Sequence, residues 1–589
     1  MPYFRSLLLK ARSLFTGLRG RRFSVCPASH AGSQPARPHI NAPARPVRSH
    51  PFGRGWGWVL VALLTSCDHF LEPDSSGSLT PEQAYNSVED LKNNALLSVY
   101  NRIGGSNESQ GLQGTGRGVF DFNSLTTDEA IMPRRGADWY DRGFWLTLHN
   151  HSWNAGTPSI KDMWEYLFGT VILCNENIER VKMYQVTHTD DVLNLYVAEL
   201  RAVRALYYFY LMDLFGRVPL VTTTNVTTSE IAQAERSEVF AFIVSELQQV
   251  MPLLAEAKSN MPGEYYGRMT RPVAWFLMAK LALNAEVYTH DNWTTTPRPD
   301  GKSIMFTHKG KQLNAWEYCS VCCDSVAGYG YWLQSEFEEN FQPNNEFSNE
   351  NIFTIPMDPM RYANRYNYFF RSRHYSHGAA LGGASENGTS ATLDILKAFN
   401  YGTEEQDYRF DLTFYAGPVF ENGKQVYLDN GKDPLVYYPL QIKPDLTGSP
   451  YEKTAGARLR KYAPDPNANA DGRACNNDIV LFRYADVMLM KTEAMLRNGI
   501  QHQELLNLVR RRAKAHLIEA TLENILNERF IELAWEGWRR NDMIRFGTFC
   551  QPYADRPQQP NEQDGHTTVF PIPGDLLKMH PSWTQNPGY

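Results

Sequence analysis

Amphipathic segments with the period of an α-helix recur along most of the chain from residue 80 onward. In the segment 191–215, Ala198, Ala202 and Ala205 follow one another at intervals of three or four residues, which is the spacing of one helix face. The small alanine side chains on that face allow a second helix to approach closely. We expect further helices at 80–103, 160–183, 236–257, 271–290, 313–327, 484–498, 502–515 and 521–542. Helix pairs joined by short turns suggest a tetratricopeptide-like helical solenoid, but the strict 34-residue consensus is not visible. Spacing alone therefore predicts a mostly α fold and leaves the solenoid arrangement open.

Two long stretches interrupt this helical pattern. Residues 104–158 are rich in Gly, Trp and Asn, and residues 341–480 are rich in Asn, Tyr, Pro and Gly. Loops of such length are uncommon in compact domains unless they are functional. We therefore expect long irregular loop insertions on the helical scaffold, and we expect the ligand site within them. The expected organisation is an N-terminal helical region at 80–340 that contains the first insertion, a second insertion at 341–480 and a C-terminal helical region at 481–589.

The N-terminal segment, residues 1–66, has the character of a secretion signal. It contains no acidic residue, and its basic residues precede a short apolar run at 56–64 that is too short to span a bilayer. The run ends in Leu-Thr-Ser-Cys, which resembles the cleavage box of a bacterial lipoprotein. We expect cleavage before Cys67, acylation of that cysteine and a polar tether at 67–79, so that acyl chains hold the protein on a membrane. A buried strand with a chance cysteine is the alternative, and a translation start nearer Arg54 is left open.

Charge and cysteine content argue against several classes of protein. The formal net charge is -6 at pH 7, which gives no support for nucleic-acid binding. The eight cysteines do not form the framework of a small disulfide-rich domain. Cys319, Cys322 and Cys323 lie in an expected helix, where free cysteines favour burial over metal binding. The histidine pairs at positions 149 and 151 and at positions 374 and 377 are expected in solvent-exposed loops, and we expect neither a metal nor a cofactor.

The insertions carry aromatic side chains interleaved with charged and amide side chains. Sugars have apolar faces and polar rims, so aromatic platforms beside planar hydrogen-bonding groups fit them. The expected ligand-binding residues are Trp139, Tyr140, Trp145 and Trp153 in the first insertion and Tyr362, Arg365 and Tyr366 in the second. The alternative is that these residues pack the loops onto the helical body or contact a partner protein. Four arginines within 361–373 form a basic cluster that favours an acidic or sulfated glycan.

A charged segment near the C-terminus admits two interpretations. Glu528, Glu532 and Glu536 are spaced by four residues and share one face of the expected helix. Paired carboxylates can serve in glycoside hydrolysis. Ion pairs within the helix, such as Arg529 with Glu532 and Glu536 with Arg540, explain the same pattern as a structural feature. We favour the ion pairs and expect no catalytic residue in this segment.

Several segments, in this order along the chain, resemble motifs of the SusD/RagB family. Residues 198–221 resemble the family's "E-x-R-A … F-G-x-V-P-L" segment, and residues 477–499 resemble its "RYADVLL-x-x-AEA" segment. Residues 528–547 resemble its "ER-x-x-EL-x-x-EG-x-R-x-x-D-x-x-R" helix. The matching positions in the last two segments are Arg483, Tyr484, Ala485, Asp486, Glu493, Ala494, Glu528, Arg529, Glu532, Leu533, Glu536, Gly537, Arg539, Asp542 and Arg545. The FPIP and QNPGY segments near the end also match, whereas the two insertions match poorly.

The resemblance implies a mostly helical fold around four tetratricopeptide-like units, with irregular insertions on one side that carry the ligand site. It also implies a lipid-anchored protein of the outer membrane that faces the cell exterior. Such a protein binds a glycan or another small nutrient and delivers it to a SusC-type, TonB-dependent outer-membrane transporter. No catalytic role belongs to the family, and its motifs do not fix the ligand-binding residues. The rival functions are a peptide-binding surface receptor, a surface glycoside hydrolase and a general tetratricopeptide scaffold.

Overall fold

The computed structural model describes residues 84–589 except 106–110, 114–116, 228–229, 361–370, 470–471, 554 and 561. Thr80–Tyr589 forms one compact unit by itself, and the regions expected at 80–340, 341–480 and 481–589 all lie within it. The expected leader, Cys67 and the tether lie outside the described residues, as does the expected start of the first helix at residue 80. In the described part, no helix combines the length and apolar character needed to cross a bilayer.

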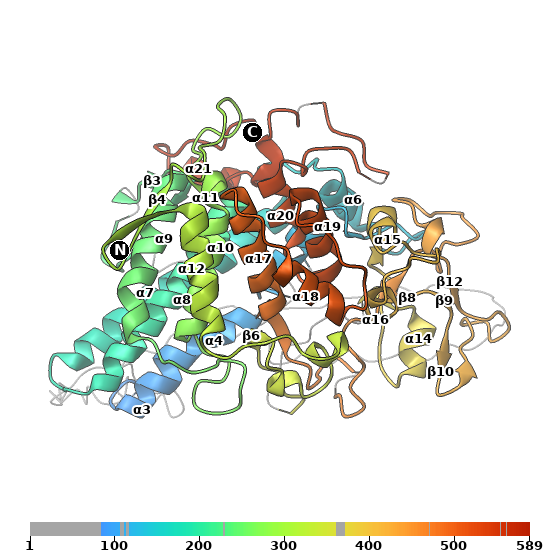
Figure 1. The fold of residues 1–589 in the computed structure, drawn as a ribbon, viewed down its shortest axis with the longest axis horizontal. Helices are drawn as coiled ribbons and strands as arrows, with labels where there is room; N and C mark the ends of the chain where they lie inside the picture. The colour runs from blue at the N-terminus through green and yellow to red at the C-terminus, as the bar shows by residue number, and fades with distance from the viewer. Residues whose placement is uncertain are drawn as a thin grey trace, which may run out of the picture. The chain divides into compact units, whose positions relative to one another are not determined.

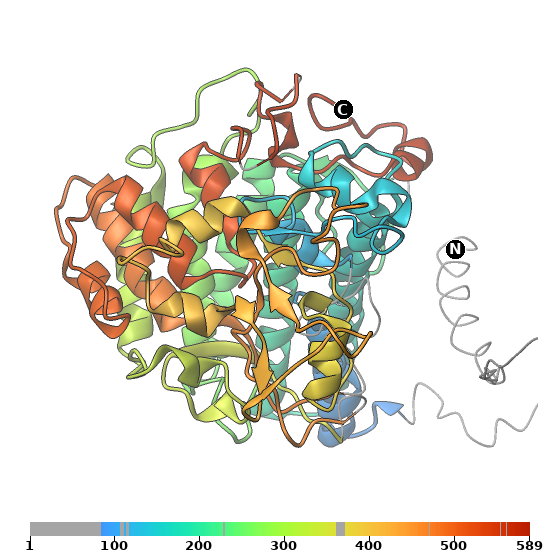
Figure 2. The ribbon, with the colours of Figure 1, turned by 90° about the vertical axis from the view of Figure 1, so that its right-hand side faces the viewer.

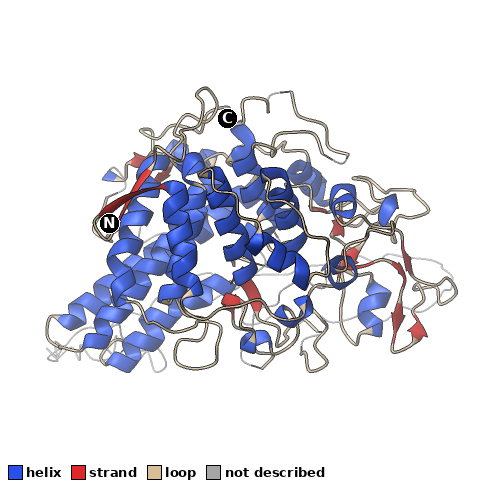
Figure 3. Cartoon of the chain, viewed as in Figure 1, coloured by secondary structure: helices blue, strands red, loops and turns tan. Residues whose placement is uncertain are grey.

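Helices make up most of the scaffold, with few and short strands, which confirms the expected mostly α fold (Figures 1 and 3). Successive helices pack against one another in the order α7, α8, α9, α10, α12 and α17, and α17 packs against α18 and α19. The scaffold helices are α3 (Val88–Asp90), the π-helix η2 (Leu91–Leu96), α4 (Leu97–Gly104), α7 (Pro158–Gln185), α8 (Asp191–Phe215), α9 (Arg236–Val250), α10 (Arg271–Leu283), α11 (Ala285–Tyr288), α12 (Ala315–Ala327), α17 (Tyr484–Arg497), α18 (Glu504–Arg512), α19 (Leu522–Glu532), α20 (Arg539–Phe546) and α21 (Gly574–Met579).

Helix α8 shows why the sequence pattern predicted this scaffold. Its N-terminus is capped by Asp190, whose carboxylate accepts the backbone N–H of Val192 at 3.0 Å. Ala198, Ala202 and Ala205 are completely buried, and α8 packs against both α7 and α9. Small side chains on the buried face allow this close approach of neighbouring helices. The helix therefore covers 191–215, as its periodicity predicted.

The expected helix at 521–542 is divided in two, which corrects the prediction. Helix α19 ends at Glu532 and α20 begins at Arg539. Between them, Trp535 and Gly537 adopt left-handed backbone conformations with φ of +57° and +78°. The backbone and indole N–H groups of Trp535 donate to the carboxylate and the carbonyl of Glu129, at 3.0 and 2.9 Å. This tertiary contact stabilises a break that helical periodicity does not reveal.

A pair of strands closes the base of the second insertion. Strand β6 (Asn351–Ile355) pairs antiparallel with β14 (Ile479–Arg483), and the two lie between α12 and α17 in the chain. The chain thus leaves the scaffold after β6 and returns to it through β14. The other short strands are β1 (Ala130–Ile131) with β7 (Ser390–Ala391), β2 (Val218–Pro219) with β3 (Gln233–Ala234), β4 (Met305–His308) with β5 (Lys311–Asn314), β8 (Phe414–Tyr415) with β13 (Arg458–Leu459), β9 (Gly417–Pro418) with β12 (Val436–Tyr437), and β10 (Phe420–Glu421) with β11 (Lys424–Gln425).

The remaining described helices are short, and most belong to the insertions. Helices α5 (Val119–Ser124) and α6 (Phe144–His149) lie in the first insertion, and α14 (Tyr375–Ala380), α15 (Leu393–Ala398) and α16 (Arg409–Thr413) lie in the second. The 3-10 turns are η3 (Asp141–Gly143), η5 (Met251–Leu253), η6 (Phe337–Asn340), η7 (Asn345–Phe347), η8 (Pro439–Gln441) and η9 (His566–Thr568).

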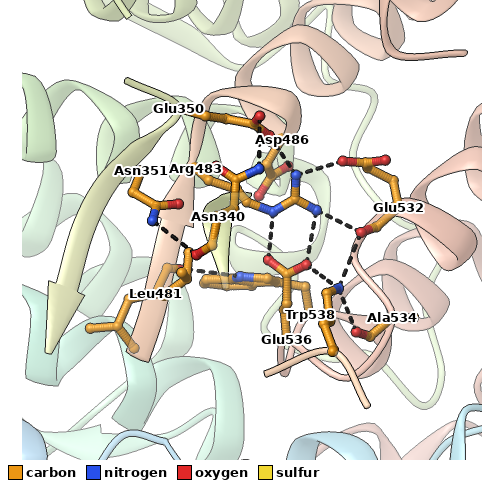
Figure 4. Close-up of polar contacts among 12 residues, drawn as sticks. Asn340, Glu350, Asn351, Leu481, Arg483, Asp486, Glu532, Ala534, Glu536 and Trp538 are labelled. Carbon is orange, nitrogen blue, oxygen red and sulfur yellow. Dashed lines mark hydrogen bonds and ion pairs between the residues drawn. The ribbon is translucent and has the colours of Figure 1, made fainter. Parts of the chain in front are cut away.

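A buried ion-pair network joins β14 to the C-terminal helices (Figure 4). The guanidinium of Arg483 lies between three carboxylates, with N···O distances of 2.7 Å to Glu350, 2.5 Å to Glu532 and 2.8 Å to Glu536. All four side chains are almost completely buried. Buried charges are tolerated when each has opposite charges and hydrogen bonds around it. The arrangement therefore fixes the end of β14 against α19 and the turn that follows it.

Further cations from the insertion and from α18 complete the network. Arg409 pairs with Glu528 and Glu532, each at 2.7 Å, and Arg512 pairs with Glu532 and with Glu350. These partners differ from the expected pairs Arg529–Glu532 and Glu536–Arg540, so the structural interpretation of the charges is right but the assigned partners were wrong. The reason is that the carboxylates face inward, toward β14 and the second insertion, rather than along the surface of their own helix.

A second buried carboxylate, Asp478, lies immediately before β14. Its oxygens accept hydrogen bonds from the backbone N–H of Met357 at 2.9 Å, from Thr354 at 3.1 Å and from the hydroxyl of Tyr266. No cation pairs with it among the described residues. Burial raises the pKa of Asp478 to about 7, because the charged form loses its hydration.

Replacing Asp478 with asparagine should therefore remove part of the pH dependence of stability. Between the usual unfolded pKa near 4 and the folded pKa near 7, the folded state holds one more proton than the unfolded state, so stability falls as pH rises. Between pH 4 and pH 7.5, the unfolding free energy of the wild type should fall by about 2–4 kcal/mol more than that of Asp478→Asn. Urea titrations at each pH measure both values. The exposed Asp433→Asn is the control, and parallel pH profiles for wild type and Asp478→Asn would contradict this assignment.

The expected helix at 313–327 also forms, as α12 (Ala315–Ala327). Asn314 caps it by accepting the backbone N–H groups of Trp316 and Glu317, each at 3.0 Å. Its cysteines are packed in the helical core, at positions 319, 322 and 323. This confirms the interpretation of the cysteine cluster as a buried helix face.

Candidate functional site

The two insertions meet where their chains pair. Strand β1 of the first insertion pairs antiparallel with β7 of the second, with Ala130 opposite Ala391 and Ile131 opposite Ser390. Just beyond β1, the backbone of Arg134 exchanges hydrogen bonds with Pro444 and Leu446, each at 2.9 Å. In Figure 2, the cyan part of the first insertion approaches the yellow and orange part of the second insertion, consistent with the pairing of β1 with β7. The two insertions, whose paired strands are more than two hundred residues apart in the sequence, thus form one surface.

Two buried arginines hold this junction together. Arg371 of the second insertion forms a bidentate ion pair with Asp121 of α5, in which the Nη1–Oδ2 distance is 2.9 Å. Arg135 of the first insertion donates to the hydroxyl of Ser390 at 2.8 Å and to the carbonyl of Ala455 at 2.9 Å. Bidentate guanidinium contacts are directional, so they fix orientation as well as distance. The tip of the first insertion, residues 136–143, is therefore held firmly against the second insertion.

The tip itself, residues 136–143, has a strained backbone. Trp139, Asp141 and Arg142 lie in the left-handed region, with φ of +58°, +39° and +55°. Such conformations cost about 1–3 kcal/mol for each non-glycine residue and persist only where the surroundings enforce them. For Trp139, the indole N–H donates to the carbonyl of Glu386 at 2.9 Å, and the ring meets Trp145 edge-on at 5.9 Å. Strain of this kind clusters at binding and catalytic positions, which makes the tip the candidate site.

Around the tip, aromatic rings alternate with charged groups. Tyr140 is 47% exposed, and the guanidinium of Arg134 lies 4.6 Å from the centre of its ring. Tyr375, at the start of α14, is 37% exposed, and its hydroxyl donates to Asp138 at 3.2 Å. Burial of part of the side chain raises the pKa of Tyr375 to about 12, so the hydroxyl stays protonated at neutral pH. We call the following set the candidate ligand surface: Arg134, Asp138, Trp139, Tyr140, Tyr375, Glu386 and Arg473.

The candidate ligand surface is suited to binding rather than to covalent chemistry. Its three aromatic side chains offer apolar faces, and an ion pair between Glu386 and Arg473 at 3.4 Å adds planar hydrogen-bonding groups. Aromatic faces bordered by such groups match molecules that have an apolar face and a polar rim. Among the ligand-binding residues expected from the sequence, Trp139 and Tyr140 are the two that have accessible surface at this site.

The other expected ligand-binding residues do not join this surface. Trp145 is only 3% exposed, and its indole N–H donates to Asp141 at 2.7 Å. Trp153 is 4% exposed, and its indole N–H donates to the hydroxyl of Tyr589 at 2.6 Å. Neither ring offers a face to a ligand in this conformation, because both complete the packing between loop and scaffold. The remaining three, Tyr362, Arg365 and Tyr366, lie outside the described residues.

Tyr375, Glu386 and Arg473 were not among the expected ligand-binding residues. Tyr375 stands in the aromatic-rich second insertion, so composition alone could have suggested it. Glu386 and Arg473 carry no comparable signal. Their proximity to Trp139 depends on the pairing of β1 with β7, which sequence periodicity does not specify for strands of two residues.

Two expectations about charged loop residues are corrected. Arg371 and Arg373 are buried, and Arg371 is neutralised by Asp121, so these two members of the basic cluster give no support for an acidic glycan. The four histidines expected in exposed loops, at positions 149, 151, 374 and 377, are all buried. His151, for example, contacts Glu562 and Arg556 in the core. No cluster of three potential metal ligands occurs among the described residues.

The carboxylates of the C-terminal segment also lack the properties of a catalytic pair. Glu532 is buried, and Arg512, Arg483 and Arg409 hold its pKa well below the usual range despite the opposing effect of burial. A general acid for glycoside hydrolysis needs a raised pKa and access to the glycosidic oxygen. Glu532 has neither property.

Gly388 provides a direct way to test how Trp139 is positioned. A Cβ atom at this residue would lie 2.8 Å from the ring of Trp139 and 2.8 Å from the sulfur of Met132. Gly388→Ala should therefore displace the Trp139 ring and cost about 1–3 kcal/mol of unfolding free energy, as measured in urea. Near-ultraviolet circular dichroism should report the altered tryptophan environment. Gly574→Ala, where a Cβ atom would meet only ordinary contacts, is the matched control, and equal stability of the two variants would contradict the packing.

Two family models match different parts of the chain. The model described as "SusD family" matches residues 349–589, and the model described as "Starch-binding associating with outer membrane" matches residues 122–283. Among curated proteins, the chain is 23% identical to the starch-binding protein SusD of Bacteroides thetaiotaomicron, over 90% of this chain and 97% of that protein. It is also 23% identical to a SusD-like protein of Bacteroides ovatus, over 82% of this chain and 80% of that protein.

Solved structures share the same fold. A laminarin-binding SusD-like protein superimposes with a TM-score of 0.63 at 19% identity, over 84% of this chain and 98% of that one. Surface glycan-binding protein A from Bacteroides uniformis gives a TM-score of 0.63 at 20% identity, over 85% of this chain and 99% of that one. A SusD-like protein from Bacteroides fragilis gives 0.66 at 17% identity, over 87% and 99%. The aligned length thus includes most of this chain and nearly all of each of those structures.

Proposed function

Because the chain belongs to the SusD/RagB family, we propose that it is a cell-surface lipoprotein that binds a glycan and delivers it to a SusC-type, TonB-dependent outer-membrane transporter. The observation that carries the binding role is the candidate ligand surface, where Trp139 and Tyr140 stay accessible on a strained tip held against the second insertion. Relatives described as starch-binding, laminarin-binding and glycan-binding support a carbohydrate as the ligand class.

Trp139, Tyr140 and Tyr375 act as the stacking side chains in this proposal. The charged groups beside them, Asp138 and Arg134, bind hydroxyl groups at the rim of a sugar ring. Both insertions contribute, so the site exists only when β1 and β7 are paired. Tyr362, Arg365 and Tyr366 remain proposed contacts from the second insertion.

The anchor in this proposal is Cys67. Acylation of its thiol and amino group holds the protein in the outer membrane, and the polar segment 67–79 leaves the folded unit free to face the cell exterior. Metabolic labelling with a fatty-acid probe tests this directly, because Cys67→Ser should abolish the label and release the protein from the membrane fraction. Label retained in that variant would contradict the assignment.

The proposed role does not include catalysis. The glutamates that suggested hydrolysis are buried and bound by arginines, and the candidate ligand surface is stabilised by contacts rather than by groups poised for proton transfer. A receptor of this kind binds its ligand and releases it unchanged.

A glycan-array screen followed by calorimetry on the purified protein tests the proposal. We expect saturable binding to one class of glycan, with no change in glycan length over hours of incubation. Hydrolysis would identify a glycosidase, and binding to peptides but to no glycan would identify a peptide receptor. Co-purification of a TonB-dependent barrel from outer membranes of the native host tests the partner separately.

A further inference from the structure

A small cavity lies in the helical scaffold, away from the residues of the candidate ligand surface. It has a volume of about 70 Å³ and is lined by Arg236, Val287, His290, Trp293, Arg298, Ile544, Gly565 and Thr568. Holding one water molecule takes roughly 10–15 Å³ on this measure, so the cavity has room for about five waters or one small ion with its ligands. Trp293 is half-buried and Arg298 is exposed, which places an opening at the loop that carries them.

Arg236, the first residue of α9, is the decisive feature of this cavity. Its side chain is 1% exposed, yet its Nε and Nη2 atoms have no hydrogen-bond partner, and no carboxylate lies within ion-pair distance in the described part of the chain. Burial lowers the pKa of Arg236 to about 10, so the guanidinium remains charged at neutral pH. A buried charge without a counterion is costly, and native structures supply a partner for such groups.

The other lining groups reinforce a preference for negative charge. The indole N–H of Trp293 also has no partner, and its ring lies 5.5 Å from the Arg236 guanidinium. Arg298 lines the same cavity and is held by the carbonyls of Ile544 and Arg545, at 2.6 and 2.9 Å. No acidic residue is among the described residues that line the cavity.

Two carboxylates near the cavity, Asp213 and Asp291, have other hydrogen-bond or ion-pair partners. Asp213 binds Arg540 at 2.9 Å and accepts the hydroxyl of Tyr288 at 2.8 Å. Asp291 accepts the backbone N–H and the hydroxyl of Ser237, at 2.8 and 2.6 Å. Neither forms a direct ion pair with Arg236, and the charge of Asp213 offsets only part of the cost of burying that guanidinium.

We propose that this cavity is a binding site for a small oxyanion, in which Arg236 and Trp293 donate hydrogen bonds to the anion and Arg298 adds a second positive charge. The ligand is inorganic sulfate or phosphate, or a sulfate group carried on a sugar. The site is independent of the candidate ligand surface, so its presence does not rest on the proposed glycan binding.

Calorimetric titration of the purified protein tests the site, with sodium sulfate, sodium phosphate and a monosaccharide sulfate as ligands at constant ionic strength set by chloride. We expect saturable binding of sulfate or phosphate and a melting temperature that rises with their concentration. Binding by the free ions alone identifies an inorganic ligand, and binding by the sugar sulfate shows that the opening admits a substituted glycan. Absence of saturable binding by all three would overturn the proposal.

Two variants separate this site from general charge effects. Arg236→Met should bind at least tenfold more weakly while remaining folded without anion, because methionine removes an unpaired buried charge. Trp293→Phe keeps an aromatic ring but lacks the N–H group, and it should bind several-fold more weakly. Arg217→Met is the matched control: Arg217 also lies beside Trp293 but does not line the cavity, so binding should stay within threefold of the wild type. Equal loss in Arg217→Met and Arg236→Met would overturn the assignment.

Discussion

Replacing Arg483 with methionine should remove most or all of the stability of the folded unit. The change leaves Glu350, Glu532 and Glu536 buried beside one another without the guanidinium that binds all three. Removing one partner of a single buried ion pair costs about 3–5 kcal/mol, and total stabilities are about 5–15 kcal/mol. Because three carboxylates lose a partner at once, we expect the loss to reach at least about 5 kcal/mol. Urea unfolding followed by circular dichroism measures it.

Two further variants make this experiment decisive even if Arg483→Met does not fold. Arg483→Lys keeps the charge but cannot contact three carboxylates in one plane, so it should fold with an intermediate loss of about 2–3 kcal/mol. Lys491→Met removes an ion pair with Asp324 at the surface and should cost about 1 kcal/mol or less. If Arg483→Met were within 1 kcal/mol of the wild type, the network would not support the fold in the way proposed.

Replacing Trp139 with alanine should weaken binding of the glycan identified in the screen by about 30-fold, which corresponds to about 2 kcal/mol. The substitution removes an aromatic face from the candidate ligand surface and also releases the hydrogen bond to the carbonyl of Glu386. The strained tip loses the contact that holds it, so Tyr140 beside it should lose its fixed orientation as well. Isothermal titration calorimetry measures the affinity.

The control for this variant is Trp332→Ala. Trp332 is an exposed tryptophan outside both insertions, so its removal should leave affinity unchanged. Circular dichroism and urea unfolding should show that both variants remain folded. Unchanged affinity in Trp139→Ala would place the glycan elsewhere on the protein, and equal weakening in both variants would indicate nonspecific binding to tryptophan.

Periodicity in the sequence predicted the helices because helix formation and burial of one face are local properties. Helix α8 occupies 191–215, and α17 covers 484–497 where 484–498 was expected. The break after Glu532 was missed for a physical reason: the left-handed residue Trp535 is stabilised by hydrogen bonds to Glu129, a residue about four hundred positions earlier. A local pattern contains no information about such a contact.

The ion pairs likewise show that a local sequence pattern does not reveal contacts between distant segments. Spacing along one helix correctly indicated that the charges of 528–540 are structural, but it named partners on the same helix. Glu536 actually pairs with Arg483 and Lys461, and Arg540 pairs with Asp213. Helical spacing identifies neighbours on a surface, whereas these side chains are buried and pair across elements.

Composition pointed to aromatic residues in the insertions, and two of those residues, Trp139 and Tyr140, lie on the candidate ligand surface. Their contact with a ligand stays a prediction. Composition did not separate them from Trp145 and Trp153, because an aromatic side chain fills a core as readily as it binds a ligand. That distinction follows from the tertiary packing of α6 and the C-terminal segment.

The pairing of β6 with β14 has an evolutionary consequence. Both ends of the second insertion emerge from one antiparallel strand pair, so another segment with closely spaced ends can replace it while the helices keep their packing. The junction of β1 with β7 and the ion pair of Arg371 with Asp121 restrict that freedom, because each joins one insertion to the other. Diversification of ligand specificity on this scaffold should therefore proceed by paired changes in two distant parts of the gene.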